Sequence, residues 1–184
     1  MIQCFPGTEI EVSKLERGAS KVLFDGIFAT GGITLSQVSV MTGLEPYIIQ
    51  NWVKRGFVSS PVKRMYSRAQ FARIVIINML KEALQLDKIC ELVKIIGGNA
   101  DDPSDDLIGD NILYHIYVDI IASEKFDVLD EKAVEAAVEK GIFELSGFEK
   151  EDLKKLKKIL EIMIYAHGAT KLKAMAAEAL LMLD

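Results

Sequence analysis

The chain comprises 184 residues, half of them hydrophobic, and carries a formal net charge of −5. This length and apolar share are ample for one large or two small globular domains. No run approaches the roughly 18 to 20 apolar residues of a membrane span, and the first residues lack a signal-peptide pattern, so we expect a cytoplasmic protein without membrane contact. Cys4 and Cys90 lie far apart without a CxxC motif, which argues against a disulfide or zinc framework.

Residues 1–32 are expected to form an N-terminal segment that ends in a bracing helix. Its first 18 residues are weakly patterned, whereas Val22, Leu23, Ile27 and Phe28 suggest a short helix. Thr30-Gly31-Gly32 ends this pattern.

Residues 33–96 begin with the pattern of two short helices joined by a tight turn. Thr34 can cap the first helix, and Gly43 can end it in a left-handed conformation. Pro46 suits the first turn of the second helix. Helical spacing directs Ile48, Ile49 and Trp52 inward, and it leaves a polar outer face formed by Tyr47, Gln50, Asn51 and Lys54. Two helices joined so closely must cross steeply.

A small β-hairpin is predicted after Gly56. Its strands would be Phe57-Val58 and the alternating segment Val62–Tyr66, with a Ser-Ser-Pro turn between them. Lys63 and Arg64 would lie on this basic wing, and Tyr66 would pack inward. Ser67 can cap the next helix, and Asp87 starts another helical run.

These motifs carry a resemblance to a known family. Arg64-Met65-Tyr66-Ser67 is similar to the Arg-x-Tyr-Ser wing of the MerR family, whose DNA-binding domain is a winged helix. A closer resemblance is to a bacterial family of functionally uncharacterised proteins with a MerR-like N-terminal half. It rests on Asn51-Trp52-Val53-Lys54, Gly56-Phe57-Val58, Pro61-Val62-Lys63 and Tyr66-Ser67-Arg68. The fold expected is mainly α, with a MerR-like winged helix-turn-helix, a tiny β-hairpin wing and a following α-helical bundle.

Charge and helix composition bear on DNA binding in opposite directions. Residues 33–96 hold nine basic and four acidic residues, a net +5, so the rest of the chain carries −10. A basic island in an acidic protein suits a single nucleic-acid face. MerR-type recognition helices usually begin with Ser or Thr and carry a base-reading Arg, whereas this helix has Glu45 and Gln50. Gln50 and Asn51 could read adenine instead.

The second half of the chain is expected to be a helical bundle of residues 107–184, after an acidic linker of residues 97–106. Its apolar residues recur at helical spacing, Asp130 caps a short helix, and Gly168 is expected to separate two last helices. We expect the region from Leu153 to Leu181 to supply bundle core and the interface of a homodimer. The alternative is a monomer in which all these residues are core.

Features that suggest catalysis are weak. His115 and Asp119 have ligand-compatible spacing but lack a second His-acid pair, and the carboxylates Asp101, Asp102, Asp105 and Asp106 lack the pattern of a calcium loop. Gly-rich phosphate loops and nucleophile elbows are absent. We therefore expect no enzyme, no metal and no cofactor.

Two functions remain open. The first is a transcriptional regulator that binds double-stranded DNA through Tyr47, Gln50, Asn51, Lys54, Arg55, Lys63, Arg64, Arg68 and Arg73. The second is a protein-interaction module with a degenerate winged helix. A ligand-sensing bundle is compatible with either, with the polar groups Tyr114, His115, Tyr117, Tyr165 and His167.

Overall fold

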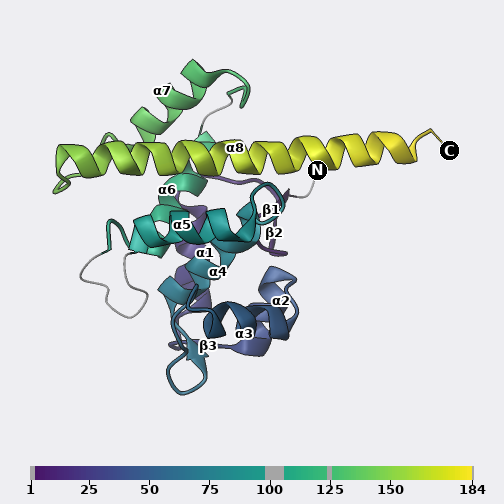
Figure 1. Cartoon of the computed structure of the whole chain (residues 1–184), viewed down its shortest axis with the longest axis vertical. Coiled ribbons are helices and arrows are strands. Elements are labelled where there is room, and N and C mark those ends of the chain that lie inside the picture. Colours follow the sequence, from purple (N-terminus) through teal and green to yellow (C-terminus); the bar gives the residue numbers. More distant parts are fainter. Residues whose placement is uncertain (1–2, 98–105, 124–125, 184) are drawn as a thin grey trace.

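A computed structural model describes residues 3–97, 106–123 and 126–183 of the chain (Figure 1). The described part is mainly helical, as predicted. Its helices are α1 (Ala19–Ile27), α2 (Leu35–Thr42), α3 (Pro46–Lys54), α4 (Arg68–Leu80), α5 (Leu86–Gly97), α6 (Asp110–Ser123), α7 (Glu131–Ile142) and α8 (Lys150–Leu181). Two small antiparallel sheets pair β1 (Gln3–Cys4) with β2 (Glu11–Val12), and β3 (Ile33–Thr34) with β4 (Met65–Tyr66).

Helix α4 is the centre of the fold. Ten of its 13 residues are buried, so it has no polar face and is covered on all sides. It packs against α2, α5, α6 and α8, and Phe71 contacts Phe24 of α1 with ring centroids 5.4 Å apart. Helices α1, α2, α5, α6 and α8 are therefore arranged around one apolar axis.

The two predicted halves share a single hydrophobic core. Buried side chains from α1 to α8 form one continuous cluster, and α6 packs along α4. A buried ion pair joins the same helices, since Nε of Arg73 lies 2.8 Å from Oδ2 of Asp110. Most of the predicted acidic linker, residues 98–105, lies outside the described residues.

The N-terminal segment is attached to the central helices by polar contacts. The Asn78 side chain on α4 donates hydrogen bonds to the carbonyls of Gly7 and Thr42 at 3.0 and 2.9 Å. The Tyr114 hydroxyl on α6 donates to the carbonyl of Pro6 at 2.8 Å. Gly7 has a φ of 75°, and a Cβ atom there would lie 2.3 Å from the Val75 carbonyl oxygen. Only glycine lets this segment approach α4 so closely.

The predicted helix ends in residues 33–96 are confirmed. Thr34 and Ser67 cap α2 and α4, each in a reciprocal capping box with the Gln three residues later. Gly43 ends α2 with a φ of 67°, and Pro46 begins α3.

The predicted hairpin is wrong in its pairing. Phe57-Val58 is not a strand; β4 instead pairs with β3, which precedes the first helix of the pair. The turn itself is a two-residue connection, because Val62 bridges to Met65. The register sets Ile33 opposite Tyr66, so the buried Tyr66 side chain closes the strand pair onto the core, as its predicted packing role requires.

Helix α8 is continuous, so the predicted break at Gly168 is wrong. Gly168 is instead a contact point: a Cβ atom there would lie 3.0 to 3.2 Å from the Val128 side chain. The part of α8 before Gly168 supplies core residues, whereas every residue from Lys171 to Leu183 is exposed. Figure 1 shows this yellow end extending beyond the other helices. No described helix combines the length and apolarity of a membrane span.

Candidate nucleic-acid interface

Helix α3 presents a polar outer face, as predicted. Ile49 and Trp52 are buried against the core, which fixes the rotation of the helix about its axis. Gln50, Asn51 and Lys54 are consequently exposed, and the Tyr47 side chain is 68% exposed. Four side chains able to donate hydrogen bonds therefore line the free side of one short helix.

The turn of the predicted wing places two cations at its tip. The Met65 amide donates to the Val62 carbonyl at 2.9 Å. The residues between them, Lys63 and Arg64, have φ values of 50° and 65°. Positive φ at both positions defines a type I′ turn, for which Asn and Gly are preferred. Lys and Arg occupy a left-handed backbone here at an energetic cost, and such strain is concentrated at functional sites.

Two further predicted residues are partly engaged within the chain. The Arg55 guanidinium lies 4.5 Å from the centroid of the Phe57 ring and 3.7 Å from Asp87. Arg68 pairs with Asp25 and lies over the Phe28 ring. Both contacts are at the surface, where an ion pair is weak and a competing anion can replace it.

Arg73 does not belong to this surface, and its predicted phosphate contact is corrected. Its side chain points into the core, is only 6% exposed and pairs with Asp110. Burial raises the pKa of Asp110, and the Arg73 charge and hydrogen bond act in the opposite direction. Gly97 makes room for the guanidinium, because a Cβ atom at that position would lie 1.8 Å from Nη2. Arg73 is a structural link between α4 and α6.

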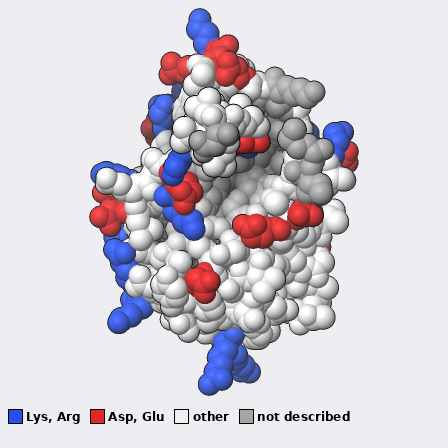
Figure 2. All heavy atoms as spheres, turned by 90° about the vertical axis from the view of Figure 1, so that its right-hand side faces the viewer, with Lys and Arg blue, Asp and Glu red and all other residues white. Residues whose placement is uncertain are grey.

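The remaining cations are available to an anionic partner. Lys54, Lys63 and Arg64 are exposed, and within the described residues none of them forms an ion pair. We call these three residues, with Tyr47, Gln50 and Asn51, the α3–wing surface. The wing turn forms the lowest point of the molecule in Figure 1. At the same lowest part of the molecule, Figure 2 shows Lys and Arg atoms, whereas the Asp and Glu atoms of that face lie higher.

One acidic residue opposes this surface. Glu45 occupies the N-cap of α3, is exposed and makes no capping hydrogen bond with its side chain. The amino end of a helix attracts anions, so a carboxylate here competes with a phosphate for the same position.

His115 and Asp119, which were considered as metal ligands, have structural partners, whereas Asp101, Asp102 and Asp105 lie outside the described residues. The His115 Nδ1 atom lies 2.9 Å from the Ser20 hydroxyl, and the Asp119 carboxylate accepts the Gly18 amide at 2.7 Å. Both contacts join α6 to the start of α1. Burial lowers the pKa of His115, which suits a neutral ring packed 4.9 Å from Phe24 between centroids.

The exposed end of α8 is a second surface. Helical spacing in the sequence did not distinguish its residues from the core residues of the same region. The end of α8 carries large apolar side chains, with Met175 63% and Leu181 76% exposed. The expectation that all of these residues are core is therefore corrected for the single chain, and the choice between monomer and homodimer stays a prediction. The consecutive run Leu180-Leu181-Met182-Leu183 is a signal that could have identified this surface, because a solvated helix face needs polar residues.

Residues 32–117 match the family model described as "Domain of unknown function (DUF1836)". The match begins just before β3 and ends within α6, so it includes the α3–wing surface and both partners of the Arg73–Asp110 pair. It also crosses the predicted linker, in agreement with the shared core. No match was found among curated proteins, and none among solved structures.

Proposed function

We propose that residues 33–96 form a MerR-like winged helix-turn-helix that binds double-stranded DNA, and that the protein is a transcriptional regulator. In this proposal α3 enters the major groove. Gln50 and Asn51 read base edges there, with Tyr47 and Lys54 beside them. Lys63 and Arg64 contact phosphates next to the groove, and Arg55 and Arg68 contribute at the margin.

The observation that carries this proposal is the set of exposed cations without intramolecular partners. Lys54, Lys63 and Arg64 lie on one surface without an ion pair in a chain with net charge −5, while many other described surface lysines and arginines form ion pairs. Phosphate neutralisation by such cations supplies most of the non-specific affinity for DNA. The strained backbone at Lys63 and Arg64 adds to this argument, because Asn-Gly would serve a purely structural turn better.

The exposed end of α8 supports a homodimer as part of the proposal. Leu172, Met175, Ala179 and Met182 follow three- and four-residue spacing, as in the seam of a coiled coil. Antiparallel pairing about a point between Met175 and Ala176 sets Lys173 of one copy opposite Glu178 of the other. Parallel pairing would set like charges together. A two-fold dimer would present two α3 helices to two half-sites.

The second candidate function is a protein-interaction module with a degenerate winged helix. Glu45 at the amino end of α3 favours it, since this charge repels phosphate. The overall negative charge of the chain favours it as well.

Selection from a random duplex pool separates the two functions. The regulator predicts an enriched motif, whereas the module predicts no enrichment even at low salt. The second step is an anisotropy titration of the Lys54→Ala/Lys63→Ala/Arg64→Ala variant on the enriched duplex. Its affinity should fall, and the salt slope should decrease by about 0.9 for each lost phosphate contact.

The matched control removes the same charge elsewhere. The control variant is Lys150→Ala/Lys154→Ala/Lys155→Ala. These three lysines are exposed in the first turns of α8, where Lys154 and Lys155 form ion pairs with Glu151 and Asp152. This variant should retain the affinity and slope of the natural chain. Equal losses in both triple variants would mean that net charge, and not the α3–wing surface, governs binding.

The dimer has its own test by sedimentation equilibrium. Met175→Glu/Met182→Glu, which changes two positions of the proposed seam, should convert dimer to monomer, while Ile95→Glu/Ile112→Glu, two exposed apolar positions elsewhere, should not. A natural chain that is monomeric at micromolar concentration would contradict this part of the proposal alone.

A further inference from the structure

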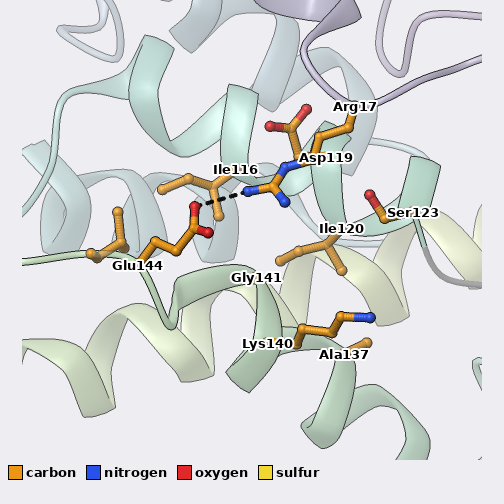
Figure 3. A pocket seen from close by; sticks show the side chains of 10 residues that line it. Arg17, Ile116, Asp119, Ile120, Ser123, Ala137, Lys140, Gly141 and Glu144 are labelled. Atoms are coloured by element: carbon orange, nitrogen blue, oxygen red, sulfur yellow. Dashed lines mark hydrogen bonds and ion pairs between the residues drawn. The ribbon is translucent and has the colours of Figure 1, made fainter.

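Two of the hollows on the described C-terminal half of the molecule differ in size and chemistry, and a further one of about 480 Å³ shares Arg17, Lys140 and Glu144 with the smaller of them. The first has a volume of about 170 Å³, and its charged lining residues come from α6, from α7 and from the segments before α1 and after α7. Figure 3 shows Arg17 directed toward Glu144 over Ile116 and Ile120, with 3.1 Å between the paired atoms. Asp119 is engaged by the Gly18 amide. This hollow is smaller than the roughly 300 to 1,000 Å³ of ligand pockets, and its Arg17 and Asp119 already have partners.

The second hollow reaches the size of a ligand pocket. Its volume is about 490 Å³, and it lies between α6, the segment 126–128 and α8. Most of its wall is apolar or aromatic, formed by Ile121, Phe126, Val128 and Ile164. The close approach of Val128 to Gly168 brings the segment 126–128 against α8 and closes this wall. We call this hollow the α6–α8 pocket.

The polar side chains that line the α6–α8 pocket are His167 and Lys171 on α8 and Tyr117 on α6. The Tyr117 hydroxyl and His167 Nδ1 are hydrogen-bonded, and Tyr117 is fully buried. Burial lowers the pKa of His167 to about 4, and the Lys171 charge acts in the same direction. Burial raises the pKa of Tyr117. A phenol that keeps its proton can donate to Nδ1 of the neutral ring, and in that tautomer the ring proton lies on Nε2.

Among the described residues that line the pocket, Lys171 is the only one charged at neutral pH. It is the one charged residue of the lining, is exposed, and within the described part of the chain has no carboxylate partner. It lies one helical turn beyond His167, so both side chains point to the same side of α8. An apolar wall that ends at one ammonium group and one imidazole N–H complements a molecule with an apolar body and one carboxylate.

We propose that the α6–α8 pocket binds a small amphipathic monocarboxylate, with Lys171 and His167 on the carboxylate and the wall from Phe126 to Val128 around the apolar body. This site is independent of DNA binding. Its residues His167, Gly168 and Lys171 lie on the part of α8 that leads into the exposed apolar end, so a bound molecule would join the segment 126–128 to that helix.

The test compares three probes of one chain length, octanoate, 1-octanol and octylamine, by isothermal titration calorimetry on the full chain. Phenylacetate is a fourth probe that distinguishes an aromatic from an alkyl body. We expect saturable binding of octanoate or phenylacetate, at least ten-fold weaker binding of octanol, and none of octylamine. Carboxylate binding should also shift the His167 side-chain nitrogen resonances.

Variants assign the binding to this pocket. Lys171→Gln should weaken carboxylate binding about ten-fold, whereas Lys132→Gln, an exposed lysine on α7 outside the lining, should leave it unchanged. The proposal is overturned by octanol binding as tightly as octanoate, by equal affinity in Lys171→Gln and the natural chain, or by the absence of saturable binding of both carboxylates.

Discussion

Arg73 on α4 and the pair Lys63–Arg64 in the wing turn are the same kinds of residue in opposite environments. Arg73 is buried and its charge is balanced by Asp110. Lys63 and Arg64 are exposed, unpaired within the described chain, and held in a strained backbone. The buried pair of Arg73 and Asp110 is explained by its role in holding the fold together. The exposed, strained positions of Lys63 and Arg64 are not explained by stability. The comparison teaches that basic residues near a predicted DNA-binding motif must be sorted by burial before they are given a role.

The largest effect is expected from Arg73. Arg73→Ala leaves the Asp110 carboxylate buried without its partner, so we expect a loss of about 3 to 5 kcal/mol in the free energy of unfolding. Urea denaturation measures this loss. Arg17→Ala, which removes an exposed ion pair with Glu144, should change stability by about 1 kcal/mol or less. If both variants were equally stable, the Arg73–Asp110 pair would not link α4 to α6 energetically.

Acidification tests a second buried group. The pKa of His167 falls from 6.5 to about 4 on burial, so the folded state binds fewer protons than the unfolded state between these values. The stability that depends on neutral His167 is therefore complete above pH 6.5 and is lost as the pH falls toward 4, a change of about 3 kcal/mol. His115 titrates in the same direction. Comparison with the His167→Asn variant isolates the contribution of His167. The unfolding free energy of this variant should fall less between pH 6.5 and 4 than that of the natural chain.

Substitution in the wing turn should raise stability, whereas substitution of the buried Arg73 should lower it. Lys63→Asn/Arg64→Gly matches the residues to the left-handed backbone, so we expect a gain of about 1 kcal/mol in stability. The same variant should lose DNA affinity and salt dependence. Thermal unfolding and anisotropy measured on one preparation give both quantities. A stability gain with unchanged binding would separate the turn from the proposed function.

The smallest effect is expected at Glu45. Glu45→Gln removes a negative charge from the amino end of α3, so DNA affinity should rise a few-fold, equivalent to about 0.3 to 1 kcal/mol. The salt slope should stay the same, because no phosphate contact is added. A decrease in affinity would show that the Glu45 side chain itself contacts the partner.

Local chemistry made much of the α2–α4 region predictable. Thr34, Gly43, Pro46 and Ser67 act within a few residues of themselves, so their roles as caps and starts of helices can be recognised without knowledge of the rest of the chain. The inward placement of Trp52 follows from helical spacing in the same way. The exposed face of α3 is the direct consequence.

Contacts between distant segments were harder to predict. The strand pair of β3 and β4 joins residues about 30 positions apart, and strands of only two residues carry little information about their partner. Arg73 could have been recognised as buried, because Ala72 and the run Ile74-Val75-Ile76-Ile77 leave α4 without a polar face. Gly168 lies within α8 and faces Val128, a contact between distant segments that no local pattern specifies.

The attachment of the N-terminal segment has a consequence for dissection of the protein. The family match begins at residue 32, yet Asn78 and Tyr114 inside the match bond to the carbonyls of Gly7 and Pro6 before it. Phe24 likewise fills the space beside Phe71 and Tyr114. A fragment cut to residues 32–117 would therefore expose an aromatic cavity and leave buried polar groups unsatisfied. The boundary of sequence similarity is not a boundary of autonomous folding in this chain.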